Sequence, residues 1–212
     1  MEEPVQFFDK GLLNQLAWYN ISMMRLPEAD ILDHDDIIAG FCADKVVLDI
    51  GCVGDIKPSE THFIIESVAS STWGVDIKNP TKDPNIITLD IDKNGIVGLP
   101  DINWEMVVCS EIIEHLKNPG NFLESLRQFN CDIIITTPNP LYFGQFLHML
   151  IGIETGNAFH FSGFTVRQFS NLARECGFDI LEAIFCTTKS HVLFTTNPYL
   201  QPNQLFRIRK YD

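Results

Sequence analysis

Five short apolar runs, each followed by a polar turn, most constrain how this chain folds. They are rich in Val and Ile and mostly apolar on both faces: Val46–Ile50, Trp73–Ile77, Asn85–Leu89, Glu105–Cys109 and Asp132–Thr136. Strands of this kind are typical of a parallel sheet that is covered by helices on both sides. Amphipathic segments between several of the runs supply those helices. The pattern therefore predicts a doubly wound, Rossmann-like α/β fold.

Helix-start signals lie in the segments between the runs. Ser59 is suited to cap one helix, and Asn118-Pro119 combines an N-cap with a proline at the first helical position. Residues 165–168 form a capping box, and Gly177 is suited to end the helix that follows. These signals predict three helices between the strands.

Two further runs, Ile180–Phe185 and Val192–Thr195, bring the expected sheet to seven strands. The connection from Cys186 to Ser190 is short, whereas a parallel crossover needs about a dozen residues or more. We therefore expect a mostly parallel sheet that ends in a C-terminal antiparallel hairpin. This architecture differs from the ordinary dehydrogenase fold.

The 212 residues fit a single domain. We expect N-terminal helices over 1–43, a core over 44–197 with a lid near 140–164, and a tail over 198–212. The formal net charge of −13 makes nucleic acid a poor partner. Six cysteines without a CxxC pair, no signal peptide and no long apolar stretch predict a cytoplasmic protein that does not insert into a membrane. The oligomeric state is not predicted.

Two strand ends carry an acid where a ligand would bind. The first run continues as LDIGCVGD, where Gly51 lets the backbone approach a ligand and Asp49 is suited to accept from a positively charged amino group. The second run ends GVDI, where Asp76 is suited to accept both hydroxyls of a ribose. A nicotinamide dehydrogenase is a weaker alternative, because the chain has no GxGxxG motif.

These motifs, together with EMVVCSEIIEHL over residues 105–116, resemble those of class I S-adenosylmethionine-dependent methyltransferases across residues 45–196. The resemblance implies that S-adenosylmethionine is the cofactor and S-adenosylhomocysteine its product. It implies that Asp49 and Gly51 line the methionine end, that Asp76 binds the ribose and that Asp90 lies near the adenine amino group. The full set of implied cofactor-binding residues is Asp49, Gly51, Cys52, Val53, Asp76, Ile77, Asp90, Ile91, Cys109 and Ser110.

The glycine loop departs from the family pattern. Val53 and Asp55 stand where the family usually has its second and third glycines. We therefore expect the loop to run differently and the next helix to begin later, toward Ser59.

The acceptor side is predicted around Glu111, Glu114 and His115, whose spacing places three ligand-type side chains on one turn. His160 lies in a segment that resembles the element before the last large helix of many small-molecule methyltransferases. His115, Glu111 and His160 are the candidate catalytic residues, and the histidines titrate in the range of a general base. Some relatives, the small-RNA 2′-O-methyltransferases and the ubiquinone-pathway O-methyltransferases, use such a cluster for a divalent metal. Glu111, Glu114 and His115 are therefore alternative metal ligands.

The leading hypothesis is methyl transfer from S-adenosylmethionine to a small molecule, at a hydroxyl oxygen. The apolar segment Leu141–Ile153 is interpreted as a lid helix over the acceptor or as core packing. The first alternative is a metal-assisted RNA 2′-O-methyltransferase, against which the acidic balance counts. The second is a non-catalytic cofactor-binding or scaffolding module, which Val53 and Asp55 in the glycine loop motivate.

Overall fold

The computed structural model describes residues 33–54, 56–153, 158–187 and 200–211. Most of the predicted N-terminal helices, over residues 1–32, and the predicted strand Val192–Thr195 lie outside the described residues. The first described helix, α2, spans His34–Cys42 and begins with Asp33 as its N-cap.

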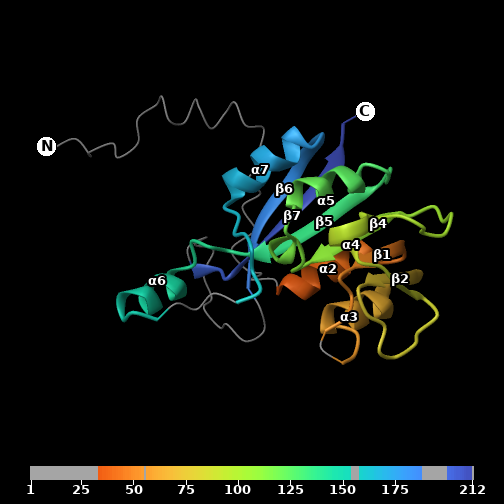
Figure 1. The fold of residues 1–212 in the computed structure, drawn as a ribbon, viewed down its shortest axis with the longest axis horizontal. Helices are drawn as coiled ribbons and strands as arrows, with labels where there is room; N and C mark the ends of the chain where they lie inside the picture. Colours follow the sequence, from red (N-terminus) through yellow and green to blue (C-terminus); the bar gives the residue numbers. More distant parts are fainter. Residues whose placement is uncertain (1–32, 55, 154–157, 188–199, 212) are drawn as a thin grey trace, which may run out of the picture.

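Seven strands form one sheet in the order β3-β2-β1-β4-β5-β7-β6 (Figure 1). The first five strands are parallel to one another, and β7 runs antiparallel to both β5 and β6. This confirms the predicted Rossmann-like sheet, mostly parallel with a C-terminal antiparallel pair. The strands are β1 Val46–Ile50, β2 Ser71–Asp76, β3 Ile86–Thr88, β4 Met106–Ser110, β5 Asp132–Pro138, β6 Phe178–Cys186 and β7 Asn203–Lys210.

The strand β7 corrects two predictions. Residues 198–212 were expected to form a tail, but Asn203–Lys210 lies inside the sheet, between β5 and β6. The connection between β6 and β7 is residues 187–202, much longer than the predicted hairpin loop. Arg207 and Arg209 tolerate this position because they pair with acids on the neighbouring strands, Arg207 with Asp132 and Glu182 and Arg209 with Asp132.

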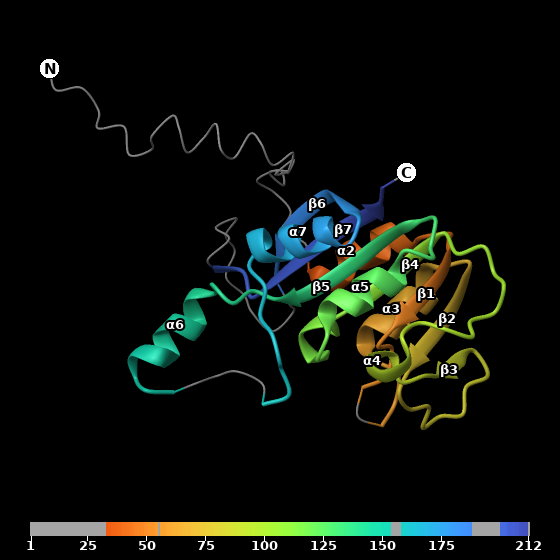
Figure 2. The same ribbon diagram turned by 45° about the horizontal axis from the view of Figure 1, so that its top comes forward.

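Helices cover both faces of the sheet (Figure 2). On one face α2 and α3, Glu60–Val68, pack on a core that includes Val47 and Ile134. On the other face α5, Pro119–Leu126, and α7, Val166–Glu175, pack on a core that includes Leu48 and Ile133. Successive strand residues thus face opposite cores, as the two-sided apolar runs predict.

The predicted helix caps are present. The Ser59 side chain accepts from the His62 backbone N–H, and the Asn118 side chain accepts from the Asn121 N–H. Both hydrogen bonds of the Thr165–Gln168 capping box form. Two shorter elements follow β3 and β4: α4, Ile91–Asn94, and the 3₁₀ helix η1, Ile113–His115.

Helix α6, Phe143–Leu150, projects away from the sheet in both views (Figures 1 and 2). None of its residues is buried, so the core-packing interpretation of this segment is wrong for the described structure. Within the described residues, no helix combines the length and the apolar character needed to span a membrane.

Candidate active site

The crevice of the fold lies where the chain reverses its direction across the sheet. β1 continues to β2 on one side, whereas β4 pairs with β1 on its other side and continues to β5. In doubly wound sheets, ligands bind at the carboxyl ends of the strands at this reversal. Here Asp49 is the last residue but one of β1 and Gly51 follows the strand, while Ser110 ends β4 and Glu111 follows it.

A cavity of about 530 Å³ occupies this crevice, a size suited to a cofactor-like ligand. Eight predicted site residues lie on its wall, six as cofactor-binding and two as catalytic residues: Gly51, Val53, Asp76, Ile77, Asp90, Ile91, Glu111 and His115. Residues that the sequence analysis did not select complete the wall: Val75, Lys78, Leu89, Asp92, Lys93, Ile112, Leu116 and Lys117. The missed residues next to Asp76 and Asp90 could have been found from the sequence, because they stand at the ends of predicted strands.

Gly51 brings the backbone after β1 close to the Ile112 side chain in the crevice. Its φ is +85°, in the left-handed region that favours glycine. A Cβ atom built on it would lie 2.6 Å from Cδ1 and 3.2 Å from Cβ of Ile112. Ile112 follows the strand end of β4, so Gly51 lets the loops after β1 and β4 meet across the cavity.

Asp76 joins the glycine loop to the end of β2. Its Oδ2 accepts from the Val53 backbone N–H at 3.0 Å, and its Oδ1 accepts from the Lys78 N–H at 3.2 Å. Burial raises the pKa of Asp76, and these backbone hydrogen bonds oppose the shift. Each carboxylate oxygen has further lone-pair capacity, so the side chain can still accept from a ligand on the cavity wall.

Asp49 does not lie on the cavity wall, in contrast to the predicted role at the methionine end. It is 2% exposed, and its Oδ2 lies 2.8 Å from Nδ1 of His62 on α3. Burial raises the pKa of Asp49 despite the hydrogen bond from His62. The sequence analysis missed His62, because its pairing with Asp49 crosses from one element to the next.

Cys52, Cys109 and Ser110 are also absent from the cavity wall. Both thiols are fully buried, and Cys52 packs beneath Gly74, where a Cβ atom would lie 2.5 Å from its sulfur. The Ser110 hydroxyl lies 3.0 Å from the Thr136 hydroxyl and 3.3 Å from Nε2 of His34. Ser110 is thus part of a hydrogen-bonded chain behind the cavity.

That chain leads to Glu111. The Thr136 hydroxyl lies 3.1 Å from Oε1 of Glu111, and the Glu111 backbone N–H donates to the same hydroxyl. His34, which the sequence analysis did not select, forms the other end of the chain and lies 3.1 Å from Oδ1 of Asp35. Glu111 itself has a φ of +51°, an uncommon conformation for this residue type that clusters at functional sites. The structure therefore fixes the direction of the Glu111 side chain from two sides.

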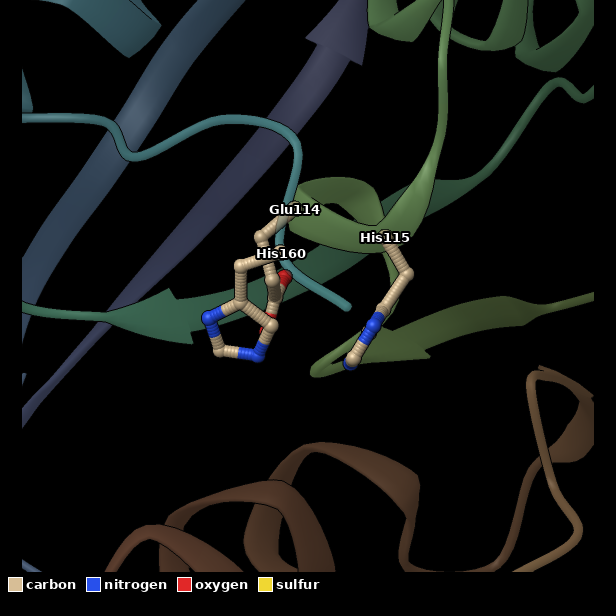
Figure 3. Close-up of side chains that lie close together, drawn as sticks. All are labelled: Glu114, His115 and His160. Carbon is tan, nitrogen blue, oxygen red and sulfur yellow. The ribbon is translucent and has the colours of Figure 1, made fainter. Parts of the chain in front are cut away.

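The three-residue helix η1 brings Glu114 and His115 next to His160 (Figure 3). The ligand atoms of these three side chains lie within 4.8 Å of one another. The loop that carries His160 is held in place because the Phe161 N–H donates to the Glu114 carbonyl at 2.8 Å. His160 and His115 contact edge to face, with ring centroids 4.5 Å apart.

The two glutamates carry more negative charge than their surroundings can balance. Glu114 is 1% exposed, and neither of its carboxyl oxygens forms a well-aligned hydrogen bond among the described residues; the Thr137 hydroxyl and the Glu111 carboxyl are its polar neighbours. Burial, and then the charge of Glu111, raise the pKa of Glu114; burial also raises the pKa of Glu111. Buried carboxylates of this kind need a proton, a cation or a polar ligand.

The histidines are set up to offer a lone pair. Nδ1 of His115 lies 3.2 Å from the Phe159 carbonyl oxygen, which can only accept. Nδ1 therefore donates in this contact, and Nε2 is the ring nitrogen left for a further partner. Burial, and then the neighbouring His115, lower the pKa of His160 and favour its neutral form. Glu114, His115 and His160 together fit a divalent cation, with Glu111 beside them.

Comparison with known proteins bears on the fold. No protein-family model matches the chain, and no curated protein matches it in sequence. A solved S-adenosylmethionine-dependent methyltransferase from Clostridium acetobutylicum is 9% identical and has a TM-score of 0.59; the match covers 87% of this chain and 93% of that one. Magnesium protoporphyrin IX methyltransferase from Synechocystis, with bound S-adenosylhomocysteine, is 13% identical over 95% of this chain and 94% of its own, with a TM-score of 0.57.

The small RNA methyltransferase HEN1 is 17% identical, with a TM-score of 0.57. The match covers 100% of this chain but 27% of HEN1. At these identities the likeness concerns the fold. The chain has the fold of the class I S-adenosylmethionine-dependent methyltransferases.

Proposed function

We propose that this protein transfers a methyl group from S-adenosylmethionine to a hydroxyl oxygen of a small molecule, with a divalent cation at the acceptor. The observation that carries the acceptor part is the buried carboxyl of Glu114, which has no well-aligned hydrogen bond among the described residues and lies within 4.8 Å of nitrogen atoms of two histidines. The cofactor part rests on the cavity at the strand reversal and on Asp76 in its wall.

In this proposal the cavity residues orient the cofactor. Asp76 accepts hydrogen bonds from the ribose hydroxyls, while Ile77 and Ile91 contact the adenine. Gly51 and Ile112 close the cavity between these residues and Glu111, on the acceptor side. S-adenosylmethionine supplies a methyl group on a positively charged sulfur, so the protein needs to align the reactants and exclude water rather than provide a nucleophile.

The acceptor hydroxyl lies at the cluster of Glu111, Glu114, His115 and His160. Glu114, His115 and His160, with Glu111 beside them, would hold the cation, which would lower the pKa of a bound hydroxyl. Two carboxylates offset the charge of a divalent ion, and the imidazole nitrogens favour Mn²⁺ or Zn²⁺ over Mg²⁺. The hydroxyl proton is lost to water, a carbon–oxygen bond forms, and the carbon–sulfur bond breaks to give neutral S-adenosylhomocysteine.

RNA 2′-O-methylation is a second candidate. It is favoured by the grouping of Glu114, His115 and His160, and by the likeness to HEN1, whose name states that it methylates small RNA. The formal charge of −13 disfavours a phosphate backbone, so the small-molecule acceptor remains the leading proposal. Transfer of labelled methyl groups to small RNA, but not to a mixture of small hydroxylated metabolites, would reverse this order.

Calorimetric titration tests the proposal in two steps. S-adenosylmethionine and S-adenosylhomocysteine are titrated into the full chain, with Asp76→Asn as the variant and the exposed Asp101→Asn as its matched control. Loss of charge-assisted hydrogen bonds lowers cofactor affinity about 10- to 100-fold in Asp76→Asn and leaves Asp101→Asn unchanged. Absence of cofactor binding in the unaltered chain would instead favour a non-catalytic scaffold.

The second step titrates Mn²⁺ into the unaltered chain and into Glu114→Gln. Binding that is about 100-fold or more weaker in Glu114→Gln supports a cation at the cluster. Equal Mn²⁺ binding by both proteins would remove the cation from the proposal and leave the histidines as general bases.

A further inference from the structure

A second cavity lies on the acceptor side of the fold. Its volume is about 280 Å³, enough for one ring of a small molecule. Its wall combines the end of β5, the start of α7 and the paired strands β6 and β7, through Asn139, Leu141, Thr165, Val166, Arg167, Phe185 and Gln204. Thr165 follows His160 by five positions, on the loop that η1 holds beside the cluster.

Gln204 places a buried hydrogen-bond acceptor in the wall of this cavity. The side chain is 1% exposed, and its amide nitrogen donates to the carbonyl oxygens of Pro138 and Phe164. These bonds fix the orientation of the amide, whose Oε1 has no hydrogen-bond partner among the described residues. A buried, unpartnered acceptor favours a ligand that brings a hydrogen-bond donor, such as a hydroxyl.

Gln204 also ties the cavity to the acceptor cluster. It lies opposite Thr137 in the register of β5 and β7, so the two side chains share one face of the sheet. Gln204 also donates to the Phe164 carbonyl, on the loop that carries His160 and that the Phe161 N–H fastens to the Glu114 carbonyl. A ring in the second cavity therefore contacts the segment that follows His160, the residue that this loop contributes to the cluster.

An apolar surface continues outward from this cavity. Leu141 lies on the cavity wall, is 53% exposed and directly precedes the segment that forms α6. The exposed apolar side chains of α6 are Phe143, Phe146, Leu147, Met149 and Leu150. At 100° per residue Phe143, Phe146, Leu147 and Leu150 fall on one side of the helix, opposite His148, while Met149 lies at the edge of this side, next to Gln145.

Two more exposed aromatic residues flank His160, one of the two histidines of the cluster. Phe159 is 73% exposed and Phe161 is 64% exposed, on either side of His160. Residues 138–153 contain no Asp, Glu, Lys or Arg. We name the exposed apolar side chains of α6, with Leu141, the α6 surface. It meets the second cavity at Leu141, which lines the cavity and is itself exposed.

We infer that the acceptor is an amphiphile, with a hydroxylated ring in the second cavity and a hydrocarbon tail along the α6 surface. The inference rests on the proposed methyl transfer and adds the substrate class. The ring brings the donor that Oε1 of Gln204 needs, and the tail covers apolar side chains that the described fold leaves exposed. An anionic bilayer is a poorer occupant, because the chain's net charge of −13 repels it.

The test is a binding series with para-alkylphenols, from para-ethylphenol to para-nonylphenol, and with the matching alkylbenzenes. Affinities are measured on the full chain in the presence of S-adenosylhomocysteine, below the concentration at which the probes aggregate. Each methylene that covers the α6 surface strengthens binding by about two- to fourfold. A phenol binds about fivefold tighter than the alkylbenzene with the same tail, because of the added hydrogen bond.

Three variants and one control, Val97→Ser, test the binding of the tail and the binding of the ring separately. Phe146→Ser and Leu147→Ser flatten the dependence on tail length, whereas Val97→Ser, 56% exposed and away from α6, leaves it unchanged. Gln204→Met removes the difference between phenol and alkylbenzene and keeps the tail dependence. Gln204 is buried, so a thermal melt checks that this variant folds; the phenol–alkylbenzene comparison in the unaltered chain tests the same point.

Several outcomes overturn the inference. Binding independent of tail length, or a tail dependence that Phe146→Ser does not change, places the tail elsewhere. If binding depends on tail length only after residues 1–32 are removed, the chain itself covers α6. If the protein is a dimer that Phe146→Ser dissociates, a second copy covers α6. In each case S-adenosylhomocysteine still binds and the proposed function stands, whereas loss of cofactor binding from the unaltered chain contradicts the proposed function itself.

Discussion

A single added methyl group at Gly51 tests how the crevice is built. Gly51→Ala introduces two costs at once: a left-handed backbone at φ +85° and a Cβ atom 2.6 Å from Cδ1 of Ile112. The left-handed conformation costs an L-residue roughly 1–2 kcal/mol. The steric overlap adds roughly 1–3 kcal/mol, typical of overpacking. Rotation of Ile112 can move Cδ1 away but leaves the Ile112 Cβ atom 3.2 Å from the new methyl group, so part of the overlap remains.

Gly98→Ala is the matched control. Gly98 has a φ of +71°, but a Cβ atom there meets nothing within 4 Å. It therefore carries the backbone cost alone, about 1–2 kcal/mol. Gly51→Ala is expected to lose roughly 2–5 kcal/mol of unfolding free energy, the sum of both costs.

Urea unfolding of the two variants and the unaltered chain measures this difference, and titration with S-adenosylhomocysteine measures the effect on the cavity. Because Ile112 lies on the cavity wall, Gly51→Ala also weakens cofactor binding by about tenfold or more, whereas Gly98→Ala does not. Equal stability losses in the two variants would show that Ile112 does not confine Gly51, and the crevice geometry argued above would then be wrong.

Two further predictions concern the acceptor cluster. Burial raises the pKa values of Glu111 and Glu114, so the folded chain binds more protons than the unfolded chain above the ordinary carboxyl pKa of about 4.3. Stability of the metal-free protein therefore falls as pH rises from about 5 to about 8, by up to about 1.4 kcal/mol per pH unit for each carboxyl. Urea unfolding in the presence of a chelator measures how the free energy of unfolding falls with pH, and Glu114→Gln is expected to reduce this fall. A free energy of unfolding that does not change with pH would contradict the raised pKa values. His34→Leu removes the contact with Ser110 behind Glu111 and weakens Mn²⁺ binding about tenfold while cofactor affinity stays unchanged; calorimetry that finds unaltered Mn²⁺ affinity would refute that positioning role.

The parts of the fold that were predictable are those encoded locally. The first five strands read as apolar on both faces, and Ser59, Asn118 and Thr165 cap helices as their side chains predict. Strand β7 was missed because Arg207 and Arg209 made residues 203–210 resemble a solvated basic tail. Only the sheet order shows that acids on β5 and β6, Asp132 and Glu182, neutralise them.

The candidate site was predictable where one strand end decides the position of a residue. Asp76 and Glu111 directly follow or end a strand, and both line the cavity. Asp49 lies one residue before the end of β1, opposite Gly74 of β2, and its side chain turns to His62 on the following helix. The His62 imidazole, 2.8 Å away, already serves as a hydrogen-bond donor to Asp49. The order of residues at strand ends does not reveal such a contact with the next helix.

The altered glycine loop shows how such a pattern can be changed without losing its geometry. Of the residues described in this loop, Gly51 has a left-handed φ, and Val53 and Gly54 do not. Val53 contributes its backbone N–H to Asp76, and any residue other than proline offers that group. An antiparallel bridge between Val53 and Pro58 turns the loop, and α3 begins only after Ser59, as expected from the missing glycines. A side chain at position 53 is therefore compatible with a working crevice, which weakens the main reason to regard the chain as a non-catalytic scaffold.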